Sequence, residues 1–178
     1  MPLAWLVLVA VLAGVAVWYL QVYGFYEDVD EITGASQMMV TLPDGARQLR
    51  QYSLVNAPGE DLTFAVKPAG EVSEWIRANL RVGDLLDVTV PFGDLPTPGP
   101  QVPVVLVSAG IGITPIRSMA ARARRDGIPY EIHYLGRERS RMAFVDELAD
   151  EHGEHLHVHC SSEGGRADLR RLMDDLAE

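Results

Sequence analysis

Apolar residues fall along the chain in runs of different kinds, and these runs predict different elements. The β-branched run Val104 to Val107 predicts a strand buried on both faces, as in a parallel sheet. The residues that follow, Ser108 to Thr114, include two glycines one residue apart. Pro115 is typical of a first helical residue, and we expect that helix to end near Arg125. This stretch therefore predicts a strand, a tight turn and a helix in succession.

The glycine-containing turn has the chemistry of an anion site. Gly110 and Gly112 have no Cβ, so the backbone can turn sharply and approach a ligand closely. Thr114 is predicted as the N-cap, which brings free N–H groups and the positive end of the helix dipole to one point. A dinucleotide pyrophosphate is the usual ligand of such a turn. The alternative is a tight strand-to-helix turn that binds nothing.

Strands and helices continue to alternate toward the C-terminus. We expect a strand, a helix, a strand and a helix over 128–135, 142–151, 156–160 and 166–176. This alternation predicts βαβ units and a parallel sheet. Three arginines that follow the second strand are candidates to meet a ribose 2′-phosphate, or else form a solvated basic surface: Arg137, Arg139 and Arg141.

Alternating histidines on the last predicted strand raise the question of a metal site. His155, His157 and His159 are spaced two apart, but no carboxylate or cysteine spacing accompanies them. We therefore interpret these histidines as structural and expect no metal.

The N-terminus is a long apolar run. Met1 to Tyr26 carries no charge, and aromatic residues lie near both ends of the segment Leu3 to Leu20. About 19 helical residues span roughly 28 Å, close to the ~30 Å hydrocarbon core of a bilayer. We therefore expect a transmembrane helix over 1–26, with a signal-like segment as the alternative.

Short strands and turns fill the part that follows, from 32 to 100. We expect strands over 36–42, 48–55, 62–67 and 85–90, with a turn at 43–45 and a short helix over 73–80. Ser73 is the expected N-cap of that helix. Several short strands with regular turns favour a small antiparallel barrel, and the Pro- and Gly-rich segment 96–103 is the expected domain boundary.

One strand of the predicted barrel carries groups that suit a nucleotide cofactor. Arg50 and Tyr52 lie two apart and therefore share a face. A guanidinium can donate two hydrogen bonds to a phosphate, and a tyrosine ring can stack on a flat ligand. Ser53 points to the other face. The alternative is an ordinary barrel strand with an exposed arginine.

Composition narrows the function. A formal net charge of −10 argues against a nucleic-acid partner. Cys160 is the only cysteine, which excludes an internal disulfide, a Cys-only zinc site and a Cys-ligated iron–sulfur cluster within this chain.

Taken together, the motifs resemble the ferredoxin–NADP reductase superfamily. Within it, the chain is most similar to the reductase part of flavohaemoproteins (nitric oxide dioxygenases) and to oxygenase reductases. The segments that carry the resemblance are RQYSL at 50–54, GEVSEWI at 70–76, VGD at 82–84, PFGD at 91–94 and SAGIGITP at 108–115.

The resemblance implies a mixed fold. We expect a partial antiparallel FAD-binding β-barrel over 32–100 and an α/β parallel-sheet NAD(P)-binding domain over 101–178, incomplete at its C-terminus, with the apolar helix over 1–26. The implied cofactors are FAD and NAD(P)H. Tyr52 is expected to stack on the flavin and Ser53 to lie near its reactive nitrogen, which makes them the expected catalytic residues. The implied cofactor-binding residues are Arg50, Gln51, Tyr52, Ser53, Gly70, Val72, Ser73, Gly110, Ile111, Gly112, Ile113, Thr114 and Pro115.

The resemblance also implies an activity, namely hydride transfer from NAD(P)H to flavin, followed by electron transfer to a separate acceptor. That acceptor is expected to be a globin or other haem protein, or an iron–sulfur protein, acting in trans. We expect a membrane-anchored protein with its globular part in the cytoplasm. The alternatives are a truncated, inactive fragment and a membrane-anchored nucleotide-binding module without turnover.

Overall fold

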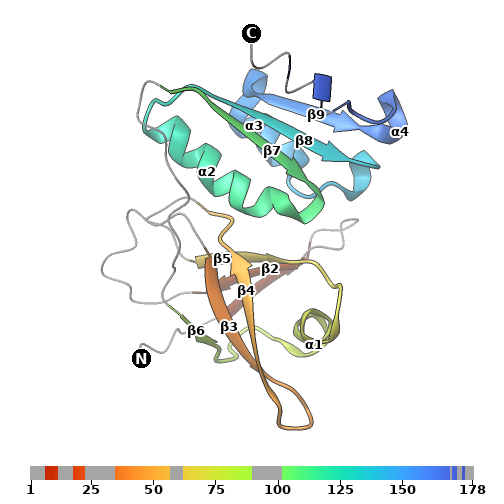
Figure 1. Cartoon of the computed structure of the whole chain (residues 1–178). Helices are drawn as coiled ribbons and strands as arrows, with labels where there is room; N and C mark the ends of the chain where they lie inside the picture. The colour runs from red at the N-terminus through yellow and green to blue at the C-terminus, as the bar shows by residue number, and fades with distance from the viewer. Residues whose placement is uncertain are drawn as a thin grey trace.

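A computed structural model describes residues 7–11, 18–22, 35–56, 62–89, 102–168, 170, 171 and 174, the first two segments by their backbone alone. Two parts lie one above the other (Figure 1). The lower part holds antiparallel strands and one helix, and the upper part holds a parallel sheet with its helices. The predicted combination of an antiparallel and a parallel sheet is confirmed.

The antiparallel part consists of two three-stranded sheets. One has the order β1-β2-β5, formed by Val7–Val11, Trp18–Val22 and Leu62–Val66. The other has the order β4-β3-β6, formed by Arg47–Ser53, Ala35–Thr41 and Asp87–Val88. An isolated antiparallel bridge between Leu54 and Phe64 connects the two sheets.

The expected N-terminal helix is wrong where the structure describes that segment. Strands β1 and β2 pair antiparallel, with Val7 opposite Val22, and β2 then pairs with β5. Periodicity alone cannot show whether a continuous apolar run forms a helix or a buried strand. Here the run forms strands, because β5 pairs with β2. The described residues include no helix that is both long and apolar enough to cross a membrane.

The β3–β4 hairpin is confirmed to within two residues of its predicted bounds. Its turn contains Gly45 at φ 83°, a conformation that glycine adopts without strain. The Gly45 N–H donates to the Leu42 carbonyl at 2.9 Å. The predicted strand 85–90 shortens to β6, which pairs with Met38 and Met39 of β3. The PFGD motif and most of the expected boundary segment 96–103 lie outside the described residues.

The core of the antiparallel part lies between its sheets and helix α1 (Glu71–Asn79). Its members are apolar and almost fully buried: Met38, Val40, Leu42, Leu54, Leu62, Phe64, Val66, Val72, Ile76, Leu80, Leu86 and Val88. Tyr52 and Trp75 pack against this cluster from its edge.

The parallel sheet has the order β7-β8-β9, formed by Val104–Ala109, Tyr130–Gly136 and Leu156–Cys160. Helices α2 (Ile113–Arg125) and α3 (Val145–His152) connect the strands. Short helical segments complete this part: η1 (Gly110–Gly112), η2 (Arg139–Arg141), η3 (Gly153–His155) and α4 (Ser161–Gly164). The expected helix over 166–176 falls largely outside the described residues.

Strand β7 is buried on one face only, which corrects the expected two-sided burial. Leu106 is 3% exposed, whereas Val105 and Val107 are 39% and 40% exposed. Residues of both α2 and α3 join the core cluster that contains Ile132 and Tyr134 of β8, so both helices cover the same face of the sheet. The opposite face is open among the described residues.

Candidate functional site

The glycine elbow, residues 108–114, lies where β7 ends and α2 begins. Gly110 has φ 56°, in the left-handed region that favours glycine, and this residue makes the turn. The buried Tyr134 hydroxyl donates to the Gly110 carbonyl at 3.3 Å. Burial raises the pKa of Tyr134 to about 12, so its hydroxyl remains a donor at physiological pH. Tyr134 therefore holds the elbow from the neighbouring strand.

Helix α2 begins two residues earlier than expected, which corrects the N-cap assignment of Thr114. The N-cap is Gly112, and the Thr114 hydroxyl donates back to the Ile111 carbonyl at 3.0 Å. Pro115 lies in the first turn, where an amide N–H would have no intrahelical acceptor, so proline fits there. The end of α2 at Arg125 is confirmed.

Two features of the elbow fit a bound pyrophosphate. Ser108 Oγ is buried and has no hydrogen-bond partner among the described residues. A Cβ added at Gly112 would meet only Ser108 Oγ, at 3.7 Å, so the backbone at Gly112 is uncrowded. An orphaned buried hydroxyl beside an accessible backbone can donate to an anion at the start of a helix.

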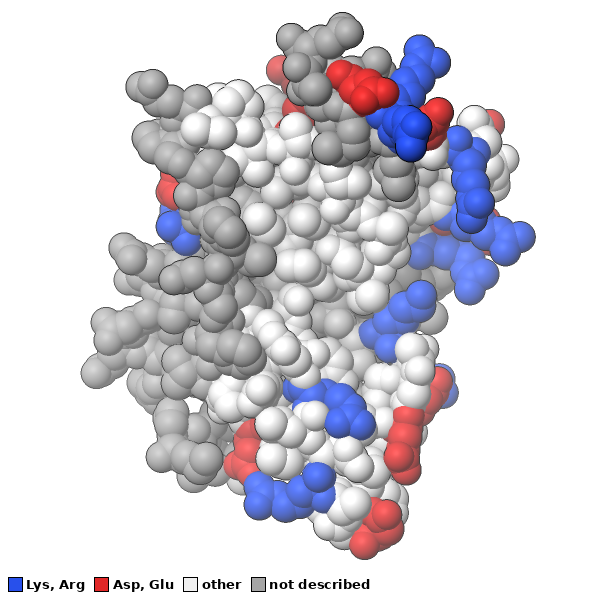
Figure 2. Space-filling view, in the orientation of Figure 1, with Lys and Arg blue, Asp and Glu red and all other residues white. Residues whose placement is uncertain are grey.

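Arginines flank the elbow at the carboxyl ends of the neighbouring strands. Figure 2 shows Lys and Arg side chains along the side of the molecule toward which β8 and β9 run. Arg137 is highly exposed, and Arg139 pairs with Asp146 at 3.6 Å. The Ser162 N–H donates to the Arg137 carbonyl at 2.9 Å, which ties this loop to the end of β9. The arrangement suits a phosphate near the elbow, and the assignment of these arginines to a 2′-phosphate stays a prediction.

Strand β4 carries the other predicted group of residues. Arg50 and Tyr52 share a face, and Arg50 also donates from its guanidinium to the Leu49 carbonyl at 2.9 Å. Burial raises the pKa of Tyr52, and the positive charge of Arg50 partly opposes that rise. The two side chains are therefore close enough to interact electrostatically. A half-buried ring beside an exposed guanidinium fits a flat cofactor that bears a phosphate. Gln51 and Ser53 lie on the other face.

Helix α1 begins two residues before its expected N-cap, Ser73. The Ser73 hydroxyl accepts from the N–H groups of Ala69 and Gly70 at 2.9 and 3.1 Å and donates to the Gly70 carbonyl. Val72 is buried in the core. Ser73 therefore stabilises the start of the helix, and only the backbone of this segment is available for the predicted diphosphate contact.

The two predicted groups of residues pack against different core clusters, and the chain passes from one cluster to the other directly after β4. Leu54, directly after β4, belongs to the antiparallel core, and Val55 belongs to the core cluster of the parallel part. Ile113 of α2 lies in that same second cluster, with Ile111 packed against it. The glycine elbow and the segment that follows β4 therefore contribute to the same core cluster. None of the hydrogen bonds among the described residues joins Tyr52 directly to Gly112.

No protein-family model matches the chain. It is 35% identical over 144 residues to the oxidoreductase NdmD of Pseudomonas putida, a match that covers 78% of this chain and 24% of that protein. It also superposes on an intact type IV self-sufficient cytochrome P450 monooxygenase (TM-score 0.81, 32% identity, 97% of this chain and 23% of that chain). Phthalate dioxygenase reductase, described as a modular structure for electron transfer from pyridine nucleotides to [2Fe-2S], gives a TM-score of 0.80 and 26% identity, and the match covers 98% of this chain and 56% of that chain.

The chain belongs to the ferredoxin reductase-type family of FAD/NAD-binding reductase domains. It spans about a quarter of the length of the first two proteins named above and about half of the third. The fold and family implied by the sequence motifs are thereby confirmed. The roles of the individual site residues stay predictions.

Two residues that support the elbow were not among the predicted site residues. Ser108 belongs to the SAGIGITP motif, so its place two residues before Gly110 was the available signal. Tyr134 offered no signal, because a tyrosine that alternates with Ile132 on the buried face of a strand looks like an ordinary core residue.

Proposed function

We propose that this ferredoxin reductase-type domain is an FAD-dependent oxidoreductase that passes a hydride from NAD(P)H to flavin and electrons onward to a separate acceptor. The observation that carries the proposal is that one short length of chain connects the two dissimilar sites. Tyr52 packs against the antiparallel core, and Val55, three residues later, belongs to the core cluster that also contains Ile113 of the elbow.

The residues of the antiparallel part would hold FAD. Arg50 would bind the pyrophosphate, because its guanidinium is exposed and donates a hydrogen bond to the Leu49 carbonyl without an ion-pair partner among the described residues. Tyr52, which is only partly buried at the edge of the core, would stack on the isoalloxazine ring. Ser53 lies at the end of β4 nearest the parallel part. The backbone near Gly70 and Val72 completes the diphosphate site.

The residues of the parallel part would hold NAD(P)H. The N–H groups of the elbow and the Ser108 hydroxyl donate to the pyrophosphate, and Thr114 and Pro115 set the direction of α2. Bound together, the two cofactors would supply hydride and one-electron chemistry, while the protein supplies orientation and polarity. Such a reaction needs no acid or base from the protein, which fits a site built from arginine, tyrosine, serine and glycine.

The acceptor would be an iron–sulfur or haem protein outside this chain. The [2Fe-2S] acceptor in the description of phthalate dioxygenase reductase and the P450 monooxygenase match both support this choice. We also propose that the described part works in the cytoplasm, where the pyridine nucleotides are.

Anaerobic reduction of the purified full chain tests the proposal. The chain is loaded with FAD, freed of excess by gel filtration and mixed with NADH or NADPH. Loss of the yellow absorbance at a rate that saturates with nucleotide supports the reductase. A chain that retains FAD but does not bleach would be a binding module, and a chain that retains no FAD would contradict the proposed cofactor.

A further inference from the structure

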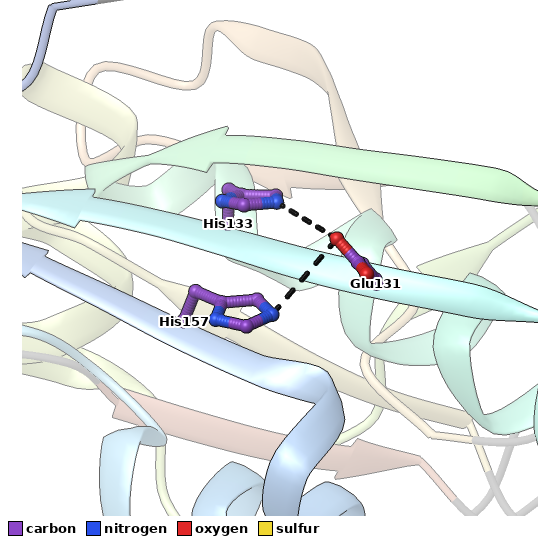
Figure 3. Close-up of side chains that lie close together, drawn as sticks. All are labelled: Glu131, His133 and His157. Carbon is purple, nitrogen blue, oxygen red and sulfur yellow. Dashed lines mark hydrogen bonds and ion pairs between the residues drawn. The ribbon is translucent and has the colours of Figure 1, made fainter. Parts of the chain in front are cut away.

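The open face of the parallel sheet carries a cluster of histidines beside one carboxylate. Glu131 and His133 project from β8, and His157 projects from the adjacent strand β9 (Figure 3). His133 and His157 are register partners in the parallel pairing, so they stand side by side on one face. Glu131 precedes His133 by two residues and therefore shares that face.

The three side chains direct their ligand atoms toward one another. Glu131 Oε2 lies 3.3 Å from His133 Nε2 and 3.9 Å from His157 Nε2, and all three ligand atoms lie within 4.8 Å of each other. In a tetrahedral zinc site with bonds of about 2.0–2.2 Å, the ligand atoms lie about 3.3 Å apart. The Glu131–His133 pair already has this spacing. The His157 ring stacks on His133 with 4.8 Å between ring centroids, and its side chain, which is 43% exposed, has to rotate inward to reach the spacing of a zinc ligand.

A fourth residue fixes the orientation of the most buried ligand. His159 Nε2 lies 3.1 Å from His133 Nδ1. When Nε2 of His133 binds a metal, Nδ1 must carry the proton, and it then donates to His159 Nε2. Metal-binding histidines commonly donate their second N–H to such a partner, which holds the tautomer and the ring direction.

We propose that Glu131, His133 and His157 form a Zn²⁺ site on the open face of the sheet, with His159 as a positioning residue. Two imidazoles and one carboxylate suit zinc rather than Mg²⁺ or Ca²⁺, which prefer oxygen ligands. Solvent reaches the site through Glu131, whose side chain is 49% exposed. The His133 side chain is only 7% exposed and forms the buried side of the site. The bound ion leaves a fourth position for water or another ligand, and it links β8 to β9.

This site is independent of the proposed reductase activity. The sequence favours a structural interpretation of the histidines because no carboxylate or cysteine has the spacing of a metal ligand beside them. Glu131 precedes His157 by 26 residues along the chain and reaches it only because β8 and β9 pair in parallel.

Zinc titration of the untagged, chelator-treated full chain tests the proposal. In competition with a chromophoric chelator, one Zn²⁺ should bind per chain, and Co²⁺ in its place should give the visible absorption of a tetrahedral complex. Glu131→Gln and His157→Ala alter half-exposed side chains and leave the core intact. Each should weaken Zn²⁺ by at least about tenfold, because outer-sphere changes alone cost about 10–100-fold.

Two further variants separate the site from general histidine binding. His155→Ala removes a histidine that stacks on Tyr130 outside the cluster, and its Zn²⁺ affinity should equal that of the wild type. His159→Ala should weaken binding about 10–100-fold, and His159→Gln, which retains an acceptor, should restore much of it. Zinc affinity unchanged in both Glu131→Gln and His157→Ala, with circular dichroism showing folded protein, would overturn the proposal. An octahedral Co²⁺ spectrum would also overturn it.

Discussion

The antiparallel part presents its candidate ligand groups on side chains, whereas the parallel part presents them on the backbone. Arg50 and Tyr52 project from a regular strand whose geometry requires neither residue. Gly110 is required by the shape of the elbow itself, at φ 56°. Substitution of Arg50 or Tyr52 should therefore remove ligand contacts without changing the fold, whereas substitution of Gly110 should change both.

The largest effect on ligand binding is expected from Arg50→Ala. Loss of a charge-assisted hydrogen bond to the flavin pyrophosphate costs about 1.5–3 kcal/mol, or about 10–150-fold in Kd. The free chain should unfold at nearly the same temperature, because Arg50 is exposed. Flavin fluorescence titration measures the Kd. Arg47→Ala is the matched control, since Arg47 lies on the same strand and pairs with Asp87 at 3.6 Å. Equal weakening by both substitutions would remove Arg50 from the site.

The features that could be predicted from the sequence are those set by neighbouring residues, and the features that were missed depend on contacts between distant segments. The turn at Gly45, the β3–β4 hairpin and the strand–elbow–helix order at 104–125 follow from local residue preferences, and all were predicted. Strands β1 and β2 were missed because the sheet they form depends on the pairing of β2 with β5, whose residues lie 40 or more positions away. The N-caps predicted at Thr114 and Ser73 were misplaced by two and three residues, since each hydroxyl donates to a carbonyl three residues earlier instead.

The sites differ in the same way. Motif residues such as Arg50 and Gly110 could be recognised from spacing. The contact of Tyr134 with the elbow and that of Glu131 with His157 arise only through parallel strand pairing. No local pattern could have indicated these contacts.

Gly110→Val should damage the parallel part itself. A side chain in the left-handed region costs roughly 1–2 kcal/mol, so the unfolding temperature should fall and the KM for NAD(P)H should rise while flavin stays bound. Thermal unfolding and steady-state kinetics with a dye acceptor measure both quantities.

Gly112→Ala gives the control within the same elbow. Its φ is −59° and the added Cβ meets only Ser108 Oγ at 3.7 Å, so stability should be unchanged. A higher KM for NAD(P)H in this variant would then mean that the added Cβ contacts the bound nucleotide. If Gly112→Ala destabilised the chain as much as Gly110→Val, the assignment of the turn to Gly110 would be wrong.

A smaller effect is expected from Ser108→Ala. The Ser108 hydroxyl has no partner among the described residues, so its removal should leave the free chain as stable or slightly more stable. Loss of a hydrogen bond to the nucleotide should weaken NAD(P)H by about 0.5–1.5 kcal/mol.

Ser36→Ala is the counterpart in the antiparallel part, because Ser36 Oγ is also buried without a partner in the described structure. It should leave NAD(P)H affinity unchanged. A comparable loss of affinity in both serine variants would show that the Ser108 hydroxyl does not contact the nucleotide.

The smallest expected effect is a pH dependence confined to the parallel part, which holds all five histidines of the chain. Burial lowers the pKa of His152 below its ordinary 6.5, and its Nδ1 lies 2.7 Å from the Tyr130 hydroxyl. Below pH 6.5 the unfolded chain therefore binds a proton that the folded chain resists, so stability is complete above this pH and declines as the pH falls toward the lowered folded value. Burial also lowers the pKa of His159, which acts in the same direction.

Hydrogen exchange measures this effect. Exchange should accelerate on acidification in β8 and α3 while β3 and β4 stay protected, and His152→Asn should reduce this acid sensitivity. Equal acceleration in both parts would mean that they unfold as one unit.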